Sequence, residues 1–561
     1  MFLFATVQHE GKTARQQRTW KGHCASLMPA FALWSAIAVA LVLLARGLPT
    51  RTFFSGDSGV KLIVARNAIE HPTHPLDIDL PRVGDQPVDF LDPFFHVQGE
   101  YAHAATPDLF PLIAAPLIAR FGIRGAFVLP ALGFLLTVWV IAALGVALDE
   151  RRSRTMLLFV AVACTPFLFY GLEFWEHTLA AAVAATATVL CVRRRSTFTL
   201  FVSGLLLGIA VLLRPEAIWY GVALLIGARW LSRRIGVTDM AVIAAGAVVG
   251  VLPFATASGV YSGQLFGAHV TRNMSGITTG WWASRVEYLS VWLVPQNTVW
   301  LIVCAFLFFA TVAANDRQRF IKIVRLVGGA FVAGVTIAAA MGVFSRASIW
   351  NAAPAVVGTF VIPLIRVRHG QTFLFTVAAV SVVLVALTTP SDGGAQWGPR
   401  YLSLAFIPLA ILTADAMTAT IRSSRFIGAI TVAVVLVSSL MIQRNAYKDL
   451  QSAKRTYERI VQFVERETAP GSYILTDLWW FDQVTAALYP TRIVLFVDNA
   501  VSVDRAFKVL ATASDIFVVR SDVESPGDGL RERQHGTAFV VKRHVGIPER
   551  SLTLAKLAKS R

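Results

Sequence analysis

Long apolar runs constrain this 561-residue chain more than any other feature of its sequence. They are about 17–25 residues long, which is the length that a helix needs to cross the hydrocarbon core of a bilayer. Charged residues make up only 15% of the chain, whereas soluble domains carry roughly a quarter. A soluble protein of this size would break its apolar residues into amphipathic patterns instead. The sequence therefore predicts a mainly α fold, a polytopic bundle of transmembrane helices.

The apolar runs predict about thirteen crossings, starting from a cytoplasmic N-terminus. The expected spans are residues 28–47, 124–148, 155–172, 177–192, 197–213, 216–230, 238–256, 290–312, 324–343, 350–365, 371–389, 401–419 and 425–442. A further run at 109–120 is too short to span and predicts an interfacial or re-entrant helix.

The net charge of +17 mainly encodes the orientation of these spans. Lys and Arg cluster between the apolar runs, as they do in cytoplasmic loops. The N-terminal tail, 1–27, is basic and is expected in the cytoplasm, which places the first loop, 50–108, outside. No basic stripe with interleaved aromatics and no DNA-binding motif occurs, so nucleic acid is not expected as a partner. The chain is expected in the inner or plasma membrane of the cell.

Residues 443–561 differ from the rest because they are polar. Helix-like stretches at 457–467 and 503–513 alternate there with β-rich runs at 473–476, 493–497, 516–519 and 538–541. This alternation is typical of a small α/β domain. We therefore expect a transmembrane domain over 28–442 and an extracytoplasmic α/β domain over 443–561.

The first polar motif follows the first span and reads Ser55-Gly56-Asp57-Ser58-Gly59-Val60-Lys61. Asp57 is expected to cap the helix that begins there, with the glycines leaving its carboxylate accessible. Lys61 lies one helical turn further and can pair with Asp57 or hold an anion beside it. The plainer interpretation is a helix cap and an interfacial lysine. Ionisable groups at the bilayer surface nevertheless favour a functional site.

The second motif opens a later span. Glu173, Glu176 and His177 are spaced i, i+3 and i+4, so they would share a helix face and could contact a substrate. Metal ligation is less expected, because ligand spacing alone is a weak signal. Trp175 is expected to anchor the chain at the membrane interface.

The last two motifs place arginines at the ends of spans. Arg214-Pro215-Glu216 offers a cation, although a tight turn with a local ion pair explains it equally well. Residues 393–401 read Gly-Gly-Ala-Gln-Trp-Gly-Pro-Arg-Tyr and lead into a late span. The guanidinium of Arg400 is a planar donor fork suited to phosphate. Trp397 and Tyr401 stand beside it.

Acidic residues give the first loop a charge balance opposite to that of the chain, and Asp92 is one of them. Asp392 is a structural alternative for Arg400, as a partner that would merely hold the loop. Histidines near these carboxylates could bind a metal, but without paired spacing a solvated loop is favoured. Neither a Walker-type loop nor a Rossmann glycine fingerprint occurs, and the four cysteines are scattered.

Together with the span pattern, these motifs resemble the GT-C superfamily of membrane glycosyltransferases, in particular bacterial relatives of the protein O-mannosyltransferases and the aminoarabinose transferases. The resemblance covers roughly residues 28–442 and depends on the segments 56–59, 173–177, 214–216 and 398–401. Family members typically carry a second acid beside the first, and this chain has Ser58 there.

The resemblance implies an enzyme that transfers a hexosyl or pentosyl unit, with inversion, from a polyprenyl-phosphate carrier to a glycan, lipid or protein outside the membrane. Asp57 would be the catalytic base that takes the proton from the acceptor hydroxyl. The donor phosphate would be held by Arg400, Lys61 and Arg214. Substrate contacts would come from Glu173, Glu176, His177, Trp397, Tyr401 and Asp92. No metal ligands are predicted, and a divalent cation stays open as a cofactor.

Two other classes of protein share this compartment. A ligase or polymerase of lipid-linked glycans would use the same kind of site. A transporter or flippase of lipid-linked sugars would carry pseudo-repeats and ionisable residues near the bilayer midplane. In this chain the span interiors are nearly free of charge and the polar motifs gather at one face. That distribution favours an interfacial active site.

Overall fold

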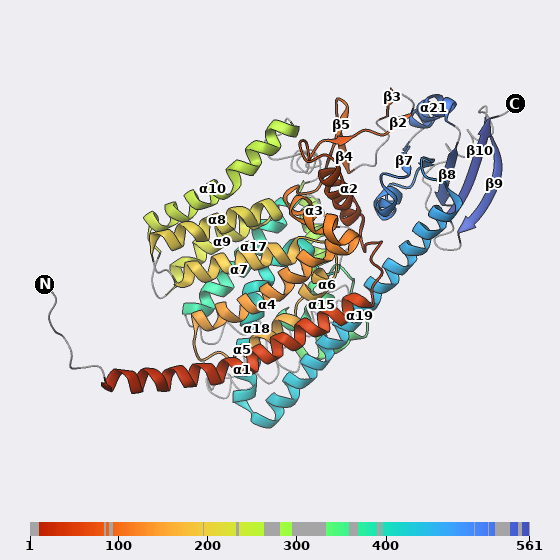
Figure 1. Cartoon of the computed structure of the whole chain (residues 1–561). Helices are drawn as coiled ribbons and strands as arrows, with labels where there is room; N and C mark the ends of the chain where they lie inside the picture. The colour runs from red at the N-terminus through yellow and green to blue at the C-terminus, as the bar shows by residue number, and fades with distance from the viewer. Residues whose placement is uncertain are drawn as a thin grey trace.

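The computed structural model describes residues 10–83, 86–88, 94–193, 196–231, 235–262, 281–293, 332–357, 369–389, 393, 397–498, 500–513, 515–521, 539–547 and 552–559. The fold is mainly helical, as the apolar runs predict. Figure 1 shows the helices gathered in one bundle, with the strands beyond one end of it.

The described α-helices are α1 (Glu10–Arg46), α2 (Gly56–Glu70), α3 (Leu109–Phe121), α4 (Val128–Leu148), α5 (Arg154–Ala163), α6 (Phe167–Gly171), α7 (His177–Arg193), α8 (Thr197–Leu213), α9 (Ala217–Gly227), α10 (Val237–Ser262), α12 (Trp281–Leu293), α15 (Ile349–Ala352), α16 (Pro354–Val357), α17 (His369–Thr388), α18 (Phe406–Ser423), α19 (Arg425–Glu467), α20 (Phe481–Val484) and α21 (Ala500–Val509). The 3-10 helices among the same residues are η1 (Gly122–Phe127), η2 (Ala228–Trp230), η4 (Arg400–Ala405), η5 (Ala486–Leu488) and η6 (Leu510–Thr512).

Within the described ranges, six helical segments are long and apolar enough to cross a membrane: Met28–Arg46, Leu109–Leu148, Val237–Gly259, Gly370–Thr388, Arg400–Arg422 and Arg425–Glu467. Four more apolar helical stretches are shorter, namely Arg154–Ala163, His177–Arg193, Thr197–Leu213 and Ala217–Trp230. Most of the expected span 290–312 lies outside the described residues. The helices indicate a multi-pass membrane protein, and the number of thirteen crossings stays a prediction.

The C-terminal part carries a five-stranded sheet with the order β7-β6-β8-β10-β9. Its strands are β6 (Tyr473–Thr476), β7 (Ile493–Phe496), β8 (Ile516–Ser521), β9 (Phe539–Ile547) and β10 (Leu552–Lys559). β6 is parallel to β7 and β8, whereas β10 is antiparallel to β8 and β9. Four of these strands overlap the β-rich runs of the sequence. The sequence did not predict β10, because its alanines and lysines are residues that strands usually lack.

One long helix connects the bundle to this sheet. α19 continues unbroken for 43 residues, past the end of its apolar run. The predicted domain start at 443 therefore falls inside a helix. α19 lies along the end of α1, where Tyr447 donates a hydrogen bond to the carbonyl of Leu44 at 3.0 Å. In Figure 1, α19 rises beside α1 toward the strands.

The first loop folds over the same end of the bundle as the C-terminal sheet (Figure 1). Its elements after α2 are β1 (Ile78–Asp79), β2 (Arg82–Val83), β3 (Gln86–Pro87), β4 (Phe95–Gln98) and β5 (Tyr101–Ala104). β1, β5 and β4 form a three-stranded sheet, and β2 pairs with β3. Arg51 makes a bidentate ion pair with Glu465 near the end of α19, at 2.9 and 3.0 Å. This ion pair thus connects the start of the first loop to the end of α19.

Candidate active site

The two residues that the sequence singles out most strongly are paired with each other. Asp57 lies in the first turn of α2, and Arg400 begins η4 directly after Pro399. The guanidinium of Arg400 donates to the carboxylate of Asp57. The side chain of Arg400 is only 12% exposed, and that of Asp57 is 23% exposed. Asp392, the alternative partner of Arg400, lies outside the described residues.

A second ion-pair group connects three of the predicted motifs. The Glu176 carboxylate is completely buried and accepts from Lys61 at 2.5 Å and from Arg214 at 3.0 Å. Arg214 also donates to Glu216 at 2.7 Å, so the local ion pair expected in that turn exists as well. The motif around Arg214 is therefore both a turn and a member of the cluster.

Tyr401 links the two groups of charges. Its ring lies under both arginines, 5.5 Å from the guanidinium carbon of Arg214 and 5.4 Å from that of Arg400. Cations are attracted to the face of an aromatic ring at such distances. We call the set Asp57, Lys61, Glu176, Arg214, Arg400 and Tyr401 the charged cluster. It brings residues from four distant parts of the chain to one place.

Two aromatic side chains of the same region have buried polar atoms. Both ring nitrogens of His177 and the indole nitrogen of Trp397 lack a hydrogen-bond partner among the residues that the structure describes. The His177 ring lies 4.9 Å from the ring of Tyr170, whose hydroxyl donates to the carbonyl of Trp397 at 2.9 Å. A buried polar group without a partner is costly and usually marks a place where a ligand or water binds. His177 and Trp397 are therefore suited to meet a polar ligand.

Glu173 belongs to a separate interaction. Its carboxylate accepts from the backbone amide of Phe54 at 2.9 Å and from the hydroxyl of Ser58 at 2.8 Å. Lys454 of α19 approaches it to 3.6 Å, and both side chains are buried. Glu173 thus holds the start of α2 in place through Phe54 and through Ser58, the residue next to Asp57.

Lys454 is not among the residues predicted from the sequence, although the sequence contains a signal for it. Ala446, Leu450 and Lys454 are all buried and are spaced four residues apart on α19. A lysine that continues an apolar helix face is unusual unless it finds a partner. Its partner Glu173 is far away in the sequence, so periodicity shows the anomaly but not the pair.

Three local expectations about the motifs are wrong. Ser55, not Asp57, is the N-cap residue of α2, and Asp57 lies inside the first turn. α7 begins only at His177, so Glu173 and Glu176 precede the helix and share no face of it. Trp175 is fully buried and donates to the hydroxyl of Ser55 at 3.2 Å, so it is not an interfacial anchor.

The glycines beside Asp57 also have another role than expected. A Cβ atom on Gly59 would lie 1.8 Å from the backbone carbonyl oxygen of Gln483 in α20. One on Gly56 would collide with the Gln483 side chain. Glycine is needed here because two backbones touch. The motif therefore fixes α2 against the C-terminal part of the chain.

The pKa values of Asp57, Glu173 and Glu176 are shifted in different directions. Burial would raise the pKa of Asp57, but the charges of Arg400 and Lys61 outweigh burial and hold that pKa below its usual range. Burial would likewise raise the pKa of Glu176, which Lys61 and Arg214 lower to about 2. For Glu173 burial prevails over Lys454, so its pKa is raised. Asp57 and Glu176 are thus ionised at neutral pH.

The last of the predicted site residues, Asp92, lies outside the described residues. Within the described ranges, no group of three or more His, Cys, Asp or Glu side chains is placed to hold a metal ion. A cavity of about 540 Å³ opens beside Lys454, between the end of α1, η1 and α19. Its lining combines apolar side chains with Arg46 and Arg124.

Comparison with known proteins places the fold. No protein-family model matches the sequence, and no curated protein matches it. The crystal structure of ArnT from Cupriavidus metallidurans bound to undecaprenyl phosphate superimposes with a TM-score of 0.54 at 13% identity, over 94% of this chain and 97% of that one. The apo form of the same ArnT gives 0.52 at 13% identity, over 94% and 98%. An Archaeoglobus fulgidus oligosaccharyltransferase in the apo form gives 0.48 at 12% identity, over 87% and 69%.

Nearly the whole of this chain and of ArnT takes part in the superposition, so the likeness is not limited to a few helices. At 13% identity the likeness concerns the fold alone. The chain has the fold of ArnT.

Proposed function

We propose that this protein is a membrane glycosyltransferase that transfers a sugar from a polyprenyl-phosphate carrier to an acceptor at the outer face of the cytoplasmic membrane. The observation that carries the proposal is the Asp57–Arg400 pair inside a cluster of buried cations. It unites a carboxylate that can take a proton with groups that can hold a phosphate. The ArnT structure with undecaprenyl phosphate supports a lipid-phosphate donor.

The cations have a clear task in such a reaction. A lipid phosphate that leaves the anomeric carbon carries negative charge, and prearranged cations stabilise it without a strong acid. The three cations come from different elements but lie close together. Arg400 and Arg214 both contact the ring of Tyr401, and Lys61 and Arg214 both pair with Glu176. The buried nitrogens of His177 and Trp397, which have no hydrogen-bond partner among the described residues, are suited to hydroxyl groups of the sugar.

Asp57 can serve as the base once the donor is bound. In the free protein Arg400 keeps the pKa of Asp57 low, which makes the carboxylate a weak base. A donor phosphate competes for the same guanidinium and brings its own negative charge near Asp57. The pKa of Asp57 then rises, and the carboxylate takes the proton of the acceptor hydroxyl. The acceptor oxygen bonds to the anomeric carbon as the bond to phosphate oxygen breaks, so one displacement inverts that centre.

The transferred sugar is a hexosyl or pentosyl unit in this proposal, and the acceptor is a glycan, lipid or protein. The lipid part of a substrate would lie in the cavity beside Lys454 in this proposal, because apolar residues of α1 and α4 line that cavity. Arg46 and Arg124 at this cavity suit an anionic headgroup.

The test is a reconstitution of the purified protein in liposomes with an isotope-labelled polyprenyl-phosphate hexose. We expect release of unsubstituted polyprenyl phosphate and a label that becomes covalently attached to an acceptor. Movement of uncleaved donor across the bilayer, without either product, would show a flippase instead. A reporter fused after residue 450 should read external; an internal reading would move the charged cluster to the wrong side.

A further inference from the structure

Helix α2 joins the charged cluster to the C-terminal part of the chain through two opposite faces. Asp57 and Lys61 are spaced four residues apart and share the face toward the bundle, where they pair with Arg400 and Glu176. A movement of α2 relative to the bundle would therefore displace the Asp57 carboxylate. The other face, with spacings of three, four and three residues, is formed by Gly56, Gly59, Ile63 and Arg66.

Gln483 of the C-terminal part fills the groove that the two glycines leave on α2. It belongs to α20 and is only 1% exposed. A Cβ atom on Gly59 would lie 1.8 Å from the backbone carbonyl oxygen of Gln483, and one on Gly56 would lie 1.3 Å from its side-chain oxygen. Gly56 and Gly59 flank Asp57 and Ser58 in the sequence. Gln483 thus contacts α2 on both sides of the proposed base.

The Gln483 side chain is itself held in place. Its side-chain amide donates to the carbonyl of Trp479 at 3.1 Å, and its backbone amide donates to the carboxylate of Asp482 at 2.6 Å. These residues belong to the segment that connects β6 to α20. The C-terminal sheet therefore holds Gln483 against the first turn of α2.

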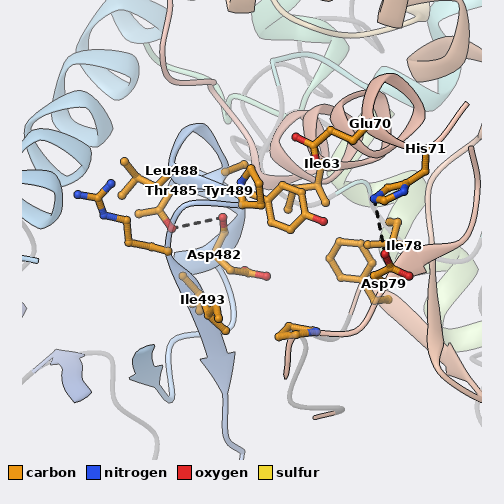
Figure 2. Close-up of a pocket in the computed structure, with 16 residues that line it drawn as sticks. Ile63, Glu70, His71, Ile78, Asp79, Asp482, Thr485, Leu488, Tyr489 and Ile493 are labelled. Carbon is orange, nitrogen blue, oxygen red and sulfur yellow. Dashed lines mark hydrogen bonds and ion pairs between the residues drawn. The ribbon is translucent and has the colours of Figure 1, made fainter. Parts of the chain in front are cut away.

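The same face of α2 contacts the C-terminal part further along the helix. Arg66 donates to the backbone carbonyls of Ala486 and Ala487 at 3.2 and 3.1 Å, and also to that of Tyr489. Figure 2 shows Ile63 beside Tyr489 at a cavity of about 270 Å³ in this interface. The interface is thus open near Ile63, whereas the two backbones touch at Gly59. The C-terminal part constrains α2 most tightly beside Asp57.

We infer that Gln483 is a positioning residue for the reaction, which holds the first turn of α2 so that Asp57 stays opposite Arg400. It acts from outside the charged cluster, because all six residues of that cluster precede the C-terminal part. The C-terminal part is then required for transfer although it contributes no group to the charged cluster. The inference rests on the proposed function, in which Asp57 is the base.

Adding one methyl group to the groove tests the inference. In Gly59→Ala the new Cβ meets a backbone carbonyl, so α2 and α20 must separate. A misplacement of about 1 Å can lower a rate by about 10²-fold, and we expect this loss in kcat for transfer from a polyprenyl-phosphate hexose in liposomes. Donor affinity should stay close to that of the wild type, because Arg214 and Arg400 lie outside α2. Gly221→Ala in α9 is the control, since its Cβ would meet no atom closer than 3.9 Å.

A second glycine variant adds a rescue and keeps the test decisive if Gly59→Ala does not fold. A Cβ atom on Gly56 collides with the end of the Gln483 side chain but lies 3.2 Å from its Cβ. Adding Gln483→Ala should therefore restore kcat in Gly56→Ala, whereas it should leave Gly59→Ala slow. A normal kcat in either glycine variant, or a Gly56→Ala loss that Gln483→Ala does not rescue, would overturn the inference.

A cross-link tests the contact without any need for transfer. The double variant Gly56→Cys/Gln483→Cys brings two Cβ atoms about as close as a disulfide requires. Mass spectrometry of the oxidised full chain in nanodiscs should find the two peptides linked, and absence of the link would overturn the inference. A wild type that forms no transfer product would contradict the proposed function, while the link still reports the contact. The two failures are thus distinguishable.

Discussion

Two buried ionic groups lie at opposite ends of the helix bundle, and they are built differently. At the end of α4 away from the charged cluster, Arg152 makes a bidentate ion pair with Asp415 at 2.8 Å for each bond. Gln371 donates to the same carboxylate at 3.1 Å, and Arg152 also donates to the carbonyl of Gly145 at 2.9 Å. The charges of Arg152 and Asp415 neutralise each other, and the Gln371 amide and the Gly145 carbonyl form the additional hydrogen bonds of the pair.

The charged cluster lacks this closure. It assembles Lys61, Arg214 and Arg400 from distant elements around Asp57, Glu176 and Glu216. Next to it the nitrogens of His177 and Trp397 are buried without a hydrogen-bond partner among the described residues. A fully satisfied network stabilises a fold, whereas an incompletely satisfied one raises its energy unless a ligand completes it. In the proposed function, this difference separates a structural ion pair from a site for an anionic substrate.

The largest expected effect is on catalysis. Asp57→Asn should lower the transfer rate by about 10²–10⁴-fold, because the amide cannot accept the proton. The melting temperature should also fall, because the variant removes the anion that pairs with Arg400, although the N-cap residue Ser55 is untouched. Transfer assays and thermal unfolding in detergent measure the two quantities. Near-normal turnover of the variant would leave Asp57 as a mere partner of Arg400.

The opposite ionic group should show the reverse pattern. Asp415→Asn leaves Arg152 without its anion in a place where the two side chains are only 9% and 16% exposed. Breaking such a pair should cost about 3 kcal/mol of stability, visible as a lower melting temperature. Donor binding should be unchanged. Weakened donor binding at intact stability would mean that the two groups do not differ in the way described.

A smaller effect is expected in the pH dependence. In the free protein the pKa of Asp57 is lowered, so its carboxylate stays ionised at pH values below those at which an Asp side chain is usually protonated. In the donor complex the phosphate draws Arg400 away and the pKa rises. The acid limb of kcat reports the complex, and that of kcat/KM the free enzyme. The kcat limb should therefore lie at higher pH. Coincident limbs would show that the donor leaves the Asp57–Arg400 pair intact.

Several residues that the sequence singles out lie together in the structure, whereas the local structure around them differs from the prediction. Asp57, Lys61, Arg214 and Arg400 are visible because each is a charged residue at the end of an apolar run. Their roles as cap or helix face depend on exact helix starts, which sequence patterns place only within a few residues. Asp57 was assigned the cap for this reason, although Ser55 holds it.

Contacts between distant segments could not be predicted in the same way. Gly59 needs its lack of a side chain because of Gln483, and Lys454 is stable in its burial because of Glu173. Gln483 is more than four hundred residues from Gly59 in the sequence, and Glu173 is more than two hundred residues from Lys454. A single sequence shows that a glycine or a buried lysine is unusual, but the fold alone supplies the reason.

Donor binding to Arg400 variants tests the central claim most directly. Polyprenyl phosphate is titrated into wild type, Arg400→Lys and Arg400→Ala in nanodiscs, with folding checked by thermal unfolding. Loss of one charge-assisted contact should cost about 1.5–3 kcal/mol, or roughly ten- to a hundredfold in affinity. Arg400→Lys should lose less, because a lysine keeps the charge but not the donor fork. If the well-folded Arg400→Ala protein binds the lipid phosphate as tightly as wild type, the cluster does not hold the donor and the account is wrong.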